Sequence, residues 1–161
     1  MNAQFNAARI RINIPAHDLP GMIEASALAN IISDCRQAVT KPGISLEFTH
    51  DFFEEEGLLQ FLASNDLNAF LYDDAPGRGI SSCIDYALAS GRPVAVSGSS
   101  MFRNLREVRP SVFVDDRSLL EIARTGPSVL LPLRQRYAPR AAGQAWNRLI
   151  VDAYEARYGL I

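Results

Sequence analysis

Short apolar segments alternate with segments of helical periodicity along most of the chain. Apolar residues either alternate with polar ones or form short continuous runs at residues 8–14, 44–50, 67–72, 93–96 and 112–114, which predicts five strands. Between and after them, apolar residues recur at helical spacing at residues 21–39, 54–64, 80–90, 101–108, 119–124 and 133–158. Strands that alternate with helices in this way predict an α/β protein.

The expected fold is a Rossmann-like three-layer α/β/α sandwich. It has a five-stranded parallel sheet in the order 3-2-1-4-5 and a long C-terminal helix. A length of 161 residues fits a single domain over residues 1–161, with residues 1–7 as a flexible leader. Ligands of such sheets bind at the carboxyl ends of the strands, beside the point where the strand order reverses. The loops expected there are residues 15–21, 73–82 and 97–103.

Composition narrows the class of protein. A net charge of −2 gives no electrostatic reason to expect a nucleic-acid partner. The chain contains no apolar run near the ~20 residues that a membrane span needs, and its first residues lack the apolar segment behind a basic start that is typical of a signal peptide, so none is expected. Cys35 and Cys83 lack metal-ligand spacing and are expected as buried thiols, which favours a cytoplasmic protein. No motif calls for a metal or another cofactor.

The strongest candidate site is the loop between the third and fourth strands. Gly77 and Gly79 allow a tight turn and a close approach of ligand to backbone. The predicted helix start, from Gly79 through Ser81 and Ser82, directs backbone N–H groups outward, and together with the helix dipole these suit a phosphate. The alternative is an ordinary strand–helix turn in which a serine caps the helix.

Residues 66–106 contain the sequence FLYDDAPGRGISSCIDYALASGRPVAVSGS, which resembles the C-terminal, donor-binding half of GT-B fold nucleotide-sugar glycosyltransferases. The resemblance implies a nucleotide-sugar or nucleoside diphosphate as the ligand. In that family a glutamate that binds the donor ribose stands at the position of Tyr86, and Asp85 is the nearest acid here. The resemblance carries over Gly77, Gly79, Ser81 and Ser82 as residues that bind the donor diphosphate. The expected donor site also includes Asp85 as a substitute for the glutamate, and Arg78 or Arg103 in place of the family's basic residues.

The same resemblance implies that the acceptor half of the enzyme lies outside this chain. No catalytic residue is therefore assigned, and the isolated domain is not expected to be active. The family's terminal helix crosses toward the acceptor half, so the aromatic face around Trp146 is expected to be exposed. Such a face predicts an acceptor-domain partner or a homo-oligomer formed through this helix.

Three further features have competing interpretations. His17 follows the first strand and is either a cleft residue or a plain turn histidine. Asp73 and Asp74 could be metal ligands, but turn capping is the favoured interpretation. The acidic run at residues 54–56 is likewise favoured as the start of a helix over a metal site. For the whole chain, the alternative function is a non-enzymatic, flavodoxin-like interaction or signalling module.

Overall fold

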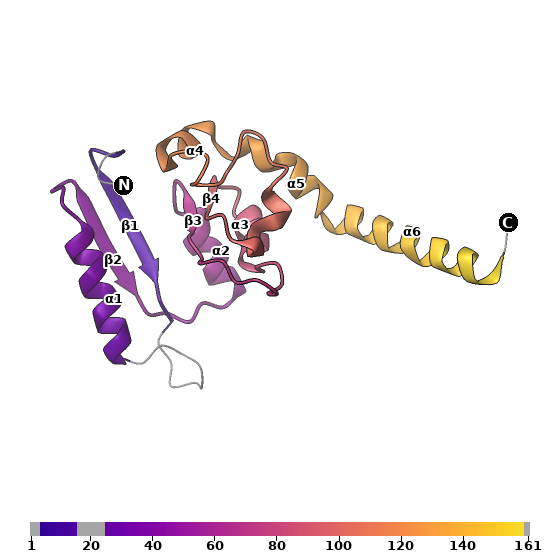
Figure 1. The fold of residues 1–161 in the computed structure, drawn as a ribbon, viewed down its shortest axis with the longest axis horizontal. Coiled ribbons are helices and arrows are strands. Elements are labelled where there is room, and N and C mark those ends of the chain that lie inside the picture. Colours follow the sequence, from indigo (N-terminus) through magenta and orange to yellow (C-terminus); the bar gives the residue numbers. More distant parts are fainter. Residues whose placement is uncertain (1–3, 16–24, 160–161) are drawn as a thin grey trace.

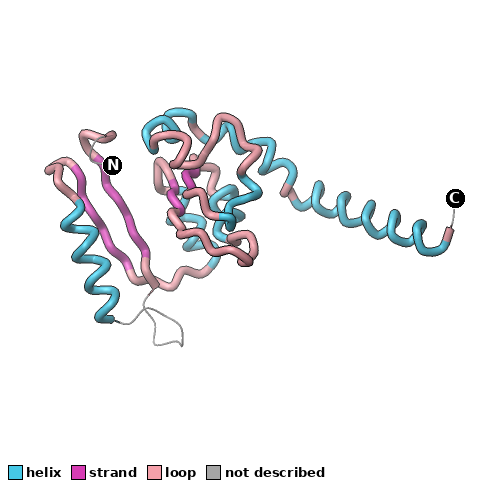
Figure 2. The backbone as a smooth tube through the Cα atoms, viewed as in Figure 1, coloured by secondary structure: helices cyan, strands magenta, loops and turns pink. Residues whose placement is uncertain are grey.

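The computed structural model describes residues 4–15 and 25–159, and Figure 1 shows its three parts in succession: an N-terminal unit, a central core and a projecting C-terminal helix. Figure 2 shows how the helices and strands follow one another along the chain. The elements, in order, are β1 (Ala8–Asn13), α1 (Ala25–Ala38), β2 (Ile44–Thr49), α2 (Glu55–Ala63), β3 (Asn68–Phe70), α3 (Cys83–Ala89), β4 (Val94–Val96), the 3-10 helix η1 (Ser100–Leu105), α4 (Leu119–Thr125), the 3-10 helix η2 (Pro127–Leu130), α5 (Leu131–Arg136) and α6 (Pro139–Tyr158).

The N-terminal unit consists of β1, α1 and β2. The two strands are parallel and paired along their whole length, from Ala8 opposite Ile44 to Asn13 opposite Thr49. Alternation in both strands places apolar residues on one face, and the guanidinium of Arg36 on α1 lies 5.8 Å from the centre of the Phe48 ring on that face. Helix α1 therefore covers the apolar face of this small sheet.

The central core surrounds β3 and β4, which are also parallel but are only three residues long. Helix α3 connects them and ends where Gly91 adopts a positive φ of 72°. Helix α4 begins with a capping box, in which Ser118 and Glu121 bond to each other's backbone N–H groups. One cluster of buried side chains joins these elements: Ile84, Ala87, Leu88, Val94, Val96, Phe102, Leu105, Val108, Val112, Phe113, Leu130 and Leu133.

Two contacts join the N-terminal unit to the rest of the molecule, one from the segment before β1 and one from β1 itself. Phe5 packs against the second buried cluster, formed by Ala95, Leu119 and Ile122. From β1, the Arg11 guanidinium donates to Ser64 Oγ at 2.6 Å and lies 4.3 Å from the centre of the Phe61 ring. These contacts hold β1 beside the end of α2.

The expected sheet is wrong. In place of five strands in the order 3-2-1-4-5, the described residues form two separate parallel sheets, β1 with β2 and β3 with β4. The third strand along the chain pairs with the fourth and not with the second, because α3 is a short crossover that returns the chain beside β3. The fifth segment is reduced to a single bridge between Val96 and Phe113, followed at once by turn residues.

The expected mixed α/β character and the long C-terminal helix are confirmed, with one change. The segment expected as one helix at residues 133–158 is broken between α5 and α6 at Ala138. Pro139 occupies the first position of α6, where its missing N–H costs no intrahelical bond. Helix α6 then extends away from the body of the molecule (Figure 1).

Candidate functional site

Two loops meet at the carboxyl ends of β3 and β4. The β3–α3 loop is residues 71–82, and the β4–η1 loop is residues 97–99. Ser97 Oγ donates to the carbonyl of Tyr72 at 2.6 Å and accepts from its N–H at 2.9 Å, and Ser99 Oγ donates to the carbonyl of Asp73 at 3.1 Å. The small residues after β4 therefore tie the two loops into one unit.

The glycine turn of the β3–α3 loop is open to the surface. Gly77 has a φ of 85°, which favours glycine, and the N–H of Arg78 closes the turn on the carbonyl of Ala75 at 3.1 Å. A Cβ placed on Gly77 or Gly79 would meet no other atom within 4 Å. The backbone of this turn is thus accessible to a ligand.

The two serines that follow the turn differ. Ser81 is buried, with 7% of its surface exposed, and its N–H donates to the carbonyl of Met101 at 3.1 Å. Its hydroxyl lies 2.9 Å from Cys83 Sγ, so both polar groups of Ser81 are engaged inside the protein. Ser82 is exposed, and as the N-cap of α3 its side chain makes no capping bond. Of the two, Ser82 is therefore the one presented to solvent.

A tyrosine completes the contacts of Cys83. Tyr72 Oη donates to Cys83 Sγ at 3.3 Å. Burial, with the Cys83 hydrogen bond as a further cause, raises the pKa of Tyr72 above its ordinary value of 10.0. The phenol is consequently neutral at physiological pH and serves here as a donor to sulfur.

Arginine side chains reach both loops. Arg103 Nη1 lies 3.4 Å from the carbonyl oxygen of Arg78 and 3.1 Å from that of Ser100. Arg106 Nη2 donates to the carbonyl of Gly98 at 3.2 Å. The structure thus brings Arg103 against the glycine turn and Arg106 against the neighbouring loop.

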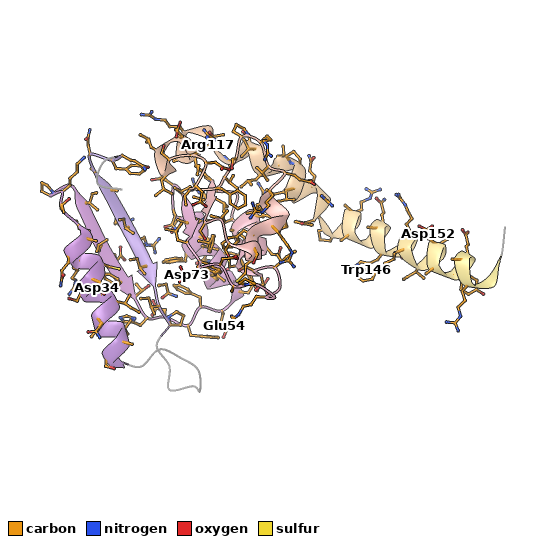
Figure 3. All side chains as sticks on the ribbon, viewed as in Figure 1. Asp34, Glu54, Asp73, Arg117, Trp146 and Asp152 are labelled. Atoms are coloured by element: carbon orange, nitrogen blue, oxygen red, sulfur yellow. The ribbon has the colours of Figure 1, made fainter. Side chains whose placement is uncertain are left out.

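Acidic groups partly balance these cations. Asp74 Oδ1 accepts the backbone N–H of Ser100 at 2.8 Å, and this bond is the main cause of its lowered pKa. Asp73, labelled in Figure 3 between the N-terminal unit and the central core in that view, is exposed. The bond from Asp74 to Ser100 agrees with the expectation that this carboxylate caps a turn.

Asp85 lies in a different setting, a shallow groove between α2 and α3. The residues that line the groove are Glu55, Leu59, Ser82, Asp85, Tyr86 and Ala89. Carboxylates from both helices therefore face one hollow, which suits hydroxyl groups better than phosphate. Glu55 was not expected here, because the acidic run indicated only a helix start and nothing local in the sequence reveals which helix packs beside it.

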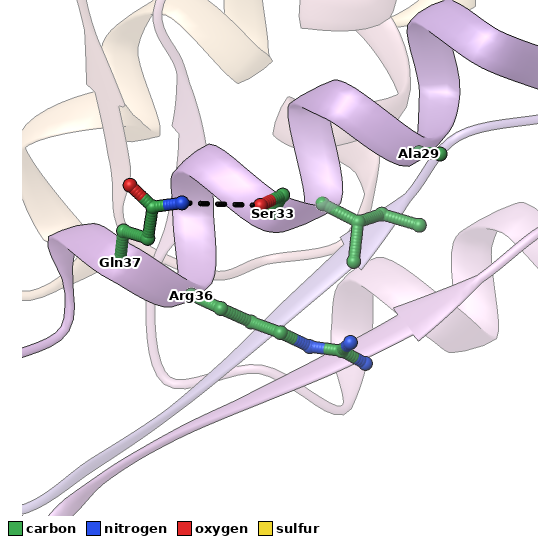
Figure 4. Close-up of a pocket in the computed structure, with 5 residues that line it drawn as sticks. Ala29, Ser33, Arg36 and Gln37 are labelled. Carbon is green, nitrogen blue, oxygen red and sulfur yellow. Dashed lines mark hydrogen bonds between the residues drawn. The ribbon is translucent and has the colours of Figure 1, made fainter.

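A second hollow lies along α1 and contains none of the expected site residues. Figure 4 shows its lining by Ala29, Ile32, Ser33, Arg36 and Gln37, with Gln37 Nε2 donating to Ser33 Oγ at 3.2 Å. All of these residues come from one helix, so the hollow is an exposed helix surface.

The remaining expectations concern metals, membranes and cysteines. Within residues 4–15 and 25–159, no group of His, Cys, Asp and Glu side chains could hold a metal ion. No described helix combines the length and the apolar character needed to cross a bilayer. Cys35 and Cys83 lie in helices as expected, but each is half-buried rather than buried. His17 lies outside the described residues.

Comparison with known proteins gives no relative for this arrangement: no family model, no curated protein and no solved structure matches the chain.

Proposed function

We propose that the chain is the nucleotide-sugar binding domain of a glycosyltransferase and holds the donor diphosphate at residues 77–82. The observation that carries the proposal is the position of Arg103, whose guanidinium lies against the exposed glycine turn. A cation beside an exposed glycine turn, which lets a ligand come close to the backbone, suits a diphosphate.

The present partners of Arg103 are weak acceptors that a phosphate can replace. Its Nη1 lies 3.4 and 3.1 Å from two neutral carbonyl oxygens. Charged phosphate oxygens make shorter and stronger bonds to a guanidinium, in a bidentate geometry that matches its planar fork. Arg78, exposed at the tip of the turn, supplies a second positive charge.

In the same proposal the sugar hydroxyls of the nucleotide lie toward α3. Ser82 belongs both to the glycine loop and to the groove lined by Asp85 and Glu55. Carboxylates accept hydrogen bonds from the two hydroxyls of a ribose. Asp85 is therefore the residue proposed for ribose recognition, one position before Tyr86, where the resembling family has its glutamate.

Transfer itself requires an acceptor held against the donor, and positioning of this kind accounts for a large part of catalysis. We propose that the acceptor half is supplied from outside these 161 residues. The isolated chain would then bind donor without transferring sugar. A cytoplasmic location, consistent with the two free cysteines, belongs to the same proposal.

NMR titration with UDP, GDP and ADP tests the binding site directly. We expect one of the three to shift the amide signals around Gly79, and the absence of shifts with all three would refute the proposal.

Gly79→Ala should weaken binding because its Cβ would enter the ligand's space, whereas Gly143→Ala, equally free of neighbours, should not. Arg103→Gln should weaken it about tenfold or more, against no change for Arg124→Gln, an exposed arginine on α4.

The second candidate is a non-enzymatic α/β interaction module. The observation that favours it is the exposed apolar surface of α6, which includes Trp146, Leu149 and Ile150. In this candidate another protein or a second copy of the chain would cover that surface. Association that persists in a chain unable to bind any nucleotide would support this candidate over the first.

A further inference from the structure

The β3–α3 loop is bonded to the start of η1 at several positions, so the loop and η1 form one unit. Ser99 Oγ, just before η1, donates to the carbonyl of Asp73 at 3.1 Å. The N–H of Ser81 donates to the carbonyl of Met101 at 3.1 Å. Phe102, also in η1, is fully buried in the central cluster and anchors η1 there. The first turn of η1 is therefore fixed relative to the loop.

Ser100, the first residue of η1, is held at both its backbone N–H and its carbonyl group. The N–H donates to Asp74 Oδ1 at 2.8 Å, and the carbonyl oxygen lies 3.1 Å from Arg103 Nη1. Arg103 follows one turn after Ser100, because a 3-10 helix has three residues per turn. The same Nη1 lies 3.4 Å from the carbonyl oxygen of Arg78 on the glycine turn. These contacts run from the Asp74 carboxylate through Ser100 and Arg103 to the glycine turn.

From this series of contacts we propose that Asp74 is a positioning residue for the diphosphate site. Its carboxylate fixes the first turn of η1 and thereby holds the guanidinium of Arg103 against the glycine turn. The inference rests on the proposed function, in which Arg103 bonds to the donor diphosphate. Asp74 does not bond to the phosphate itself, because an ionised carboxylate has no proton to donate.

The Asp74 side chain is suited to this task. A hydrogen bond from an N–H group to a charged carboxylate is shorter and stronger than one to a neutral oxygen. The bond from the Ser100 N–H also lowers the pKa of Asp74, with the positive charge of Arg106 as a lesser cause, so the carboxylate remains charged at neutral pH. Asp73, its neighbour, contributes its backbone carbonyl to the unit, so removal of the Asp73 side chain leaves that bond in place.

Titration with UDP, GDP and ADP, followed by the amide signals around Gly79, measures the effect on binding. Asp74→Ala should weaken the binding of the nucleotide that the wild type binds about fivefold, because Arg103 is no longer held in place. Asp74→Asn should stay within about twofold of the wild type, since its amide oxygen still accepts the Ser100 N–H. Asp73→Ala is the matched control and should leave the affinity unchanged.

A double-mutant cycle separates positioning of Arg103 from a general structural role of Asp74. In the Arg103→Gln background, Asp74→Ala should cause no further loss of affinity, because the group that it positions is gone. An equal loss in both backgrounds would refute the positioning role. Wild-type affinity in Asp74→Ala would overturn this role and leave the proposed function standing, whereas a wild type that binds none of the three nucleotides would overturn both.

Hydrogen exchange tests the bond between Asp74 and Ser100 without a ligand. The Ser100 amide should exchange slowly in the wild type and about tenfold faster in Asp74→Ala, while Asp73→Ala should not change its rate. Circular dichroism checks that each variant keeps its helical content. Rapid exchange of the Ser100 amide in the wild type would show that the carboxylate does not hold η1, and the proposal would fall.

Discussion

The N-terminal unit and the central core are both built from parallel strands and a helix, yet they differ in what surrounds the strands. β1 and β2 pair over six residues each, but Ile44 is the only residue of that unit that is buried among those whose burial the structure describes. β3 and β4 pair over only three residues, yet every residue of β4 is buried. The strands that share more backbone hydrogen bonds are therefore not the strands that bury more side chains. We expect the buried strands to contribute more to stability, because burial of apolar surface is the larger source of stability.

The largest expected difference between the two regions is in the free energy of unfolding lost when a large side chain is truncated. Phe102 is fully buried in the central cluster, so Phe102→Ala should lower the free energy of unfolding by about 3–5 kcal/mol. Phe48 on β2 is only half-buried, so Phe48→Ala should cost about 1 kcal/mol. Urea denaturation followed by circular dichroism measures both. Equal losses would show that the two regions are equally well packed.

Removal of the contact between the two regions should have an effect of intermediate size on the free energy of unfolding. Arg11 bonds to Ser64 and stacks on Phe61, so Arg11→Ala should lower the free energy of unfolding by about 1 kcal/mol. Arg9, exposed on the same strand, is the matched control, and its replacement by alanine should change stability by less than about 0.5 kcal/mol. Hydrogen exchange of the β1 amides should accelerate only in the Arg11 variant. If both variants behave alike, Arg11 does not join the two regions.

The smallest effect is expected at α4, which holds Leu119 and Ile122 against Phe5. Hydrogen bonds from Ser118 lower the pKa of Glu121 below its ordinary value of 4.5. A carboxyl group with a lowered pKa in the folded state stabilises the fold above the unfolded value, and that contribution is lost as the pH falls through the folded value. Stability should therefore fall as the pH drops below about 4.5.

Glu121→Gln should make this acid dependence shallower, as measured by thermal unfolding between neutral and acidic pH. Glu107→Gln, at another exposed glutamate, is the control. A pH profile unchanged by Glu121→Gln would exclude the capping box as a source of the acid sensitivity.

The sequence predicted local structure well where one segment decides the outcome. Alternation in residues 8–14 and helical spacing in residues 119–124 each produced the expected element, because the faces of strands and helices depend on neighbours in the chain. The order of strands was not predictable in the same way. It depends on which edges meet, and apolar alternation is the same whether β3 pairs with β4 or with β2.

In the candidate site, too, the features set by local sequence were predictable and those set by contacts between distant segments were not. The exposed turn at Gly77 and Gly79 followed from residue type, since glycine and proline mark turns locally. Two other features did not follow from residue type: the bond from the Ser81 N–H to the Met101 carbonyl, and the groove shared by Asp85 and Glu55. Each of them joins segments that are distant in the sequence. Burial of a particular polar group is a property of the assembled chain.

The unpaired edge of β1 affects how copies of the protein can associate in a concentrated solution. Among the described strands only β2 pairs with it, so the backbone groups of Arg9, Arg11 and Asn13 point to an edge without a partner strand. Such an edge can template the addition of further strands and lead to fibrous aggregates. The exposed Arg9 in every copy opposes this, because like charges repel each other when two such edges approach. In β1, alternation therefore gives the polar residues two tasks, since Arg11 contacts the central core and Arg9 places a charge beside the open edge, while the apolar residues face α1.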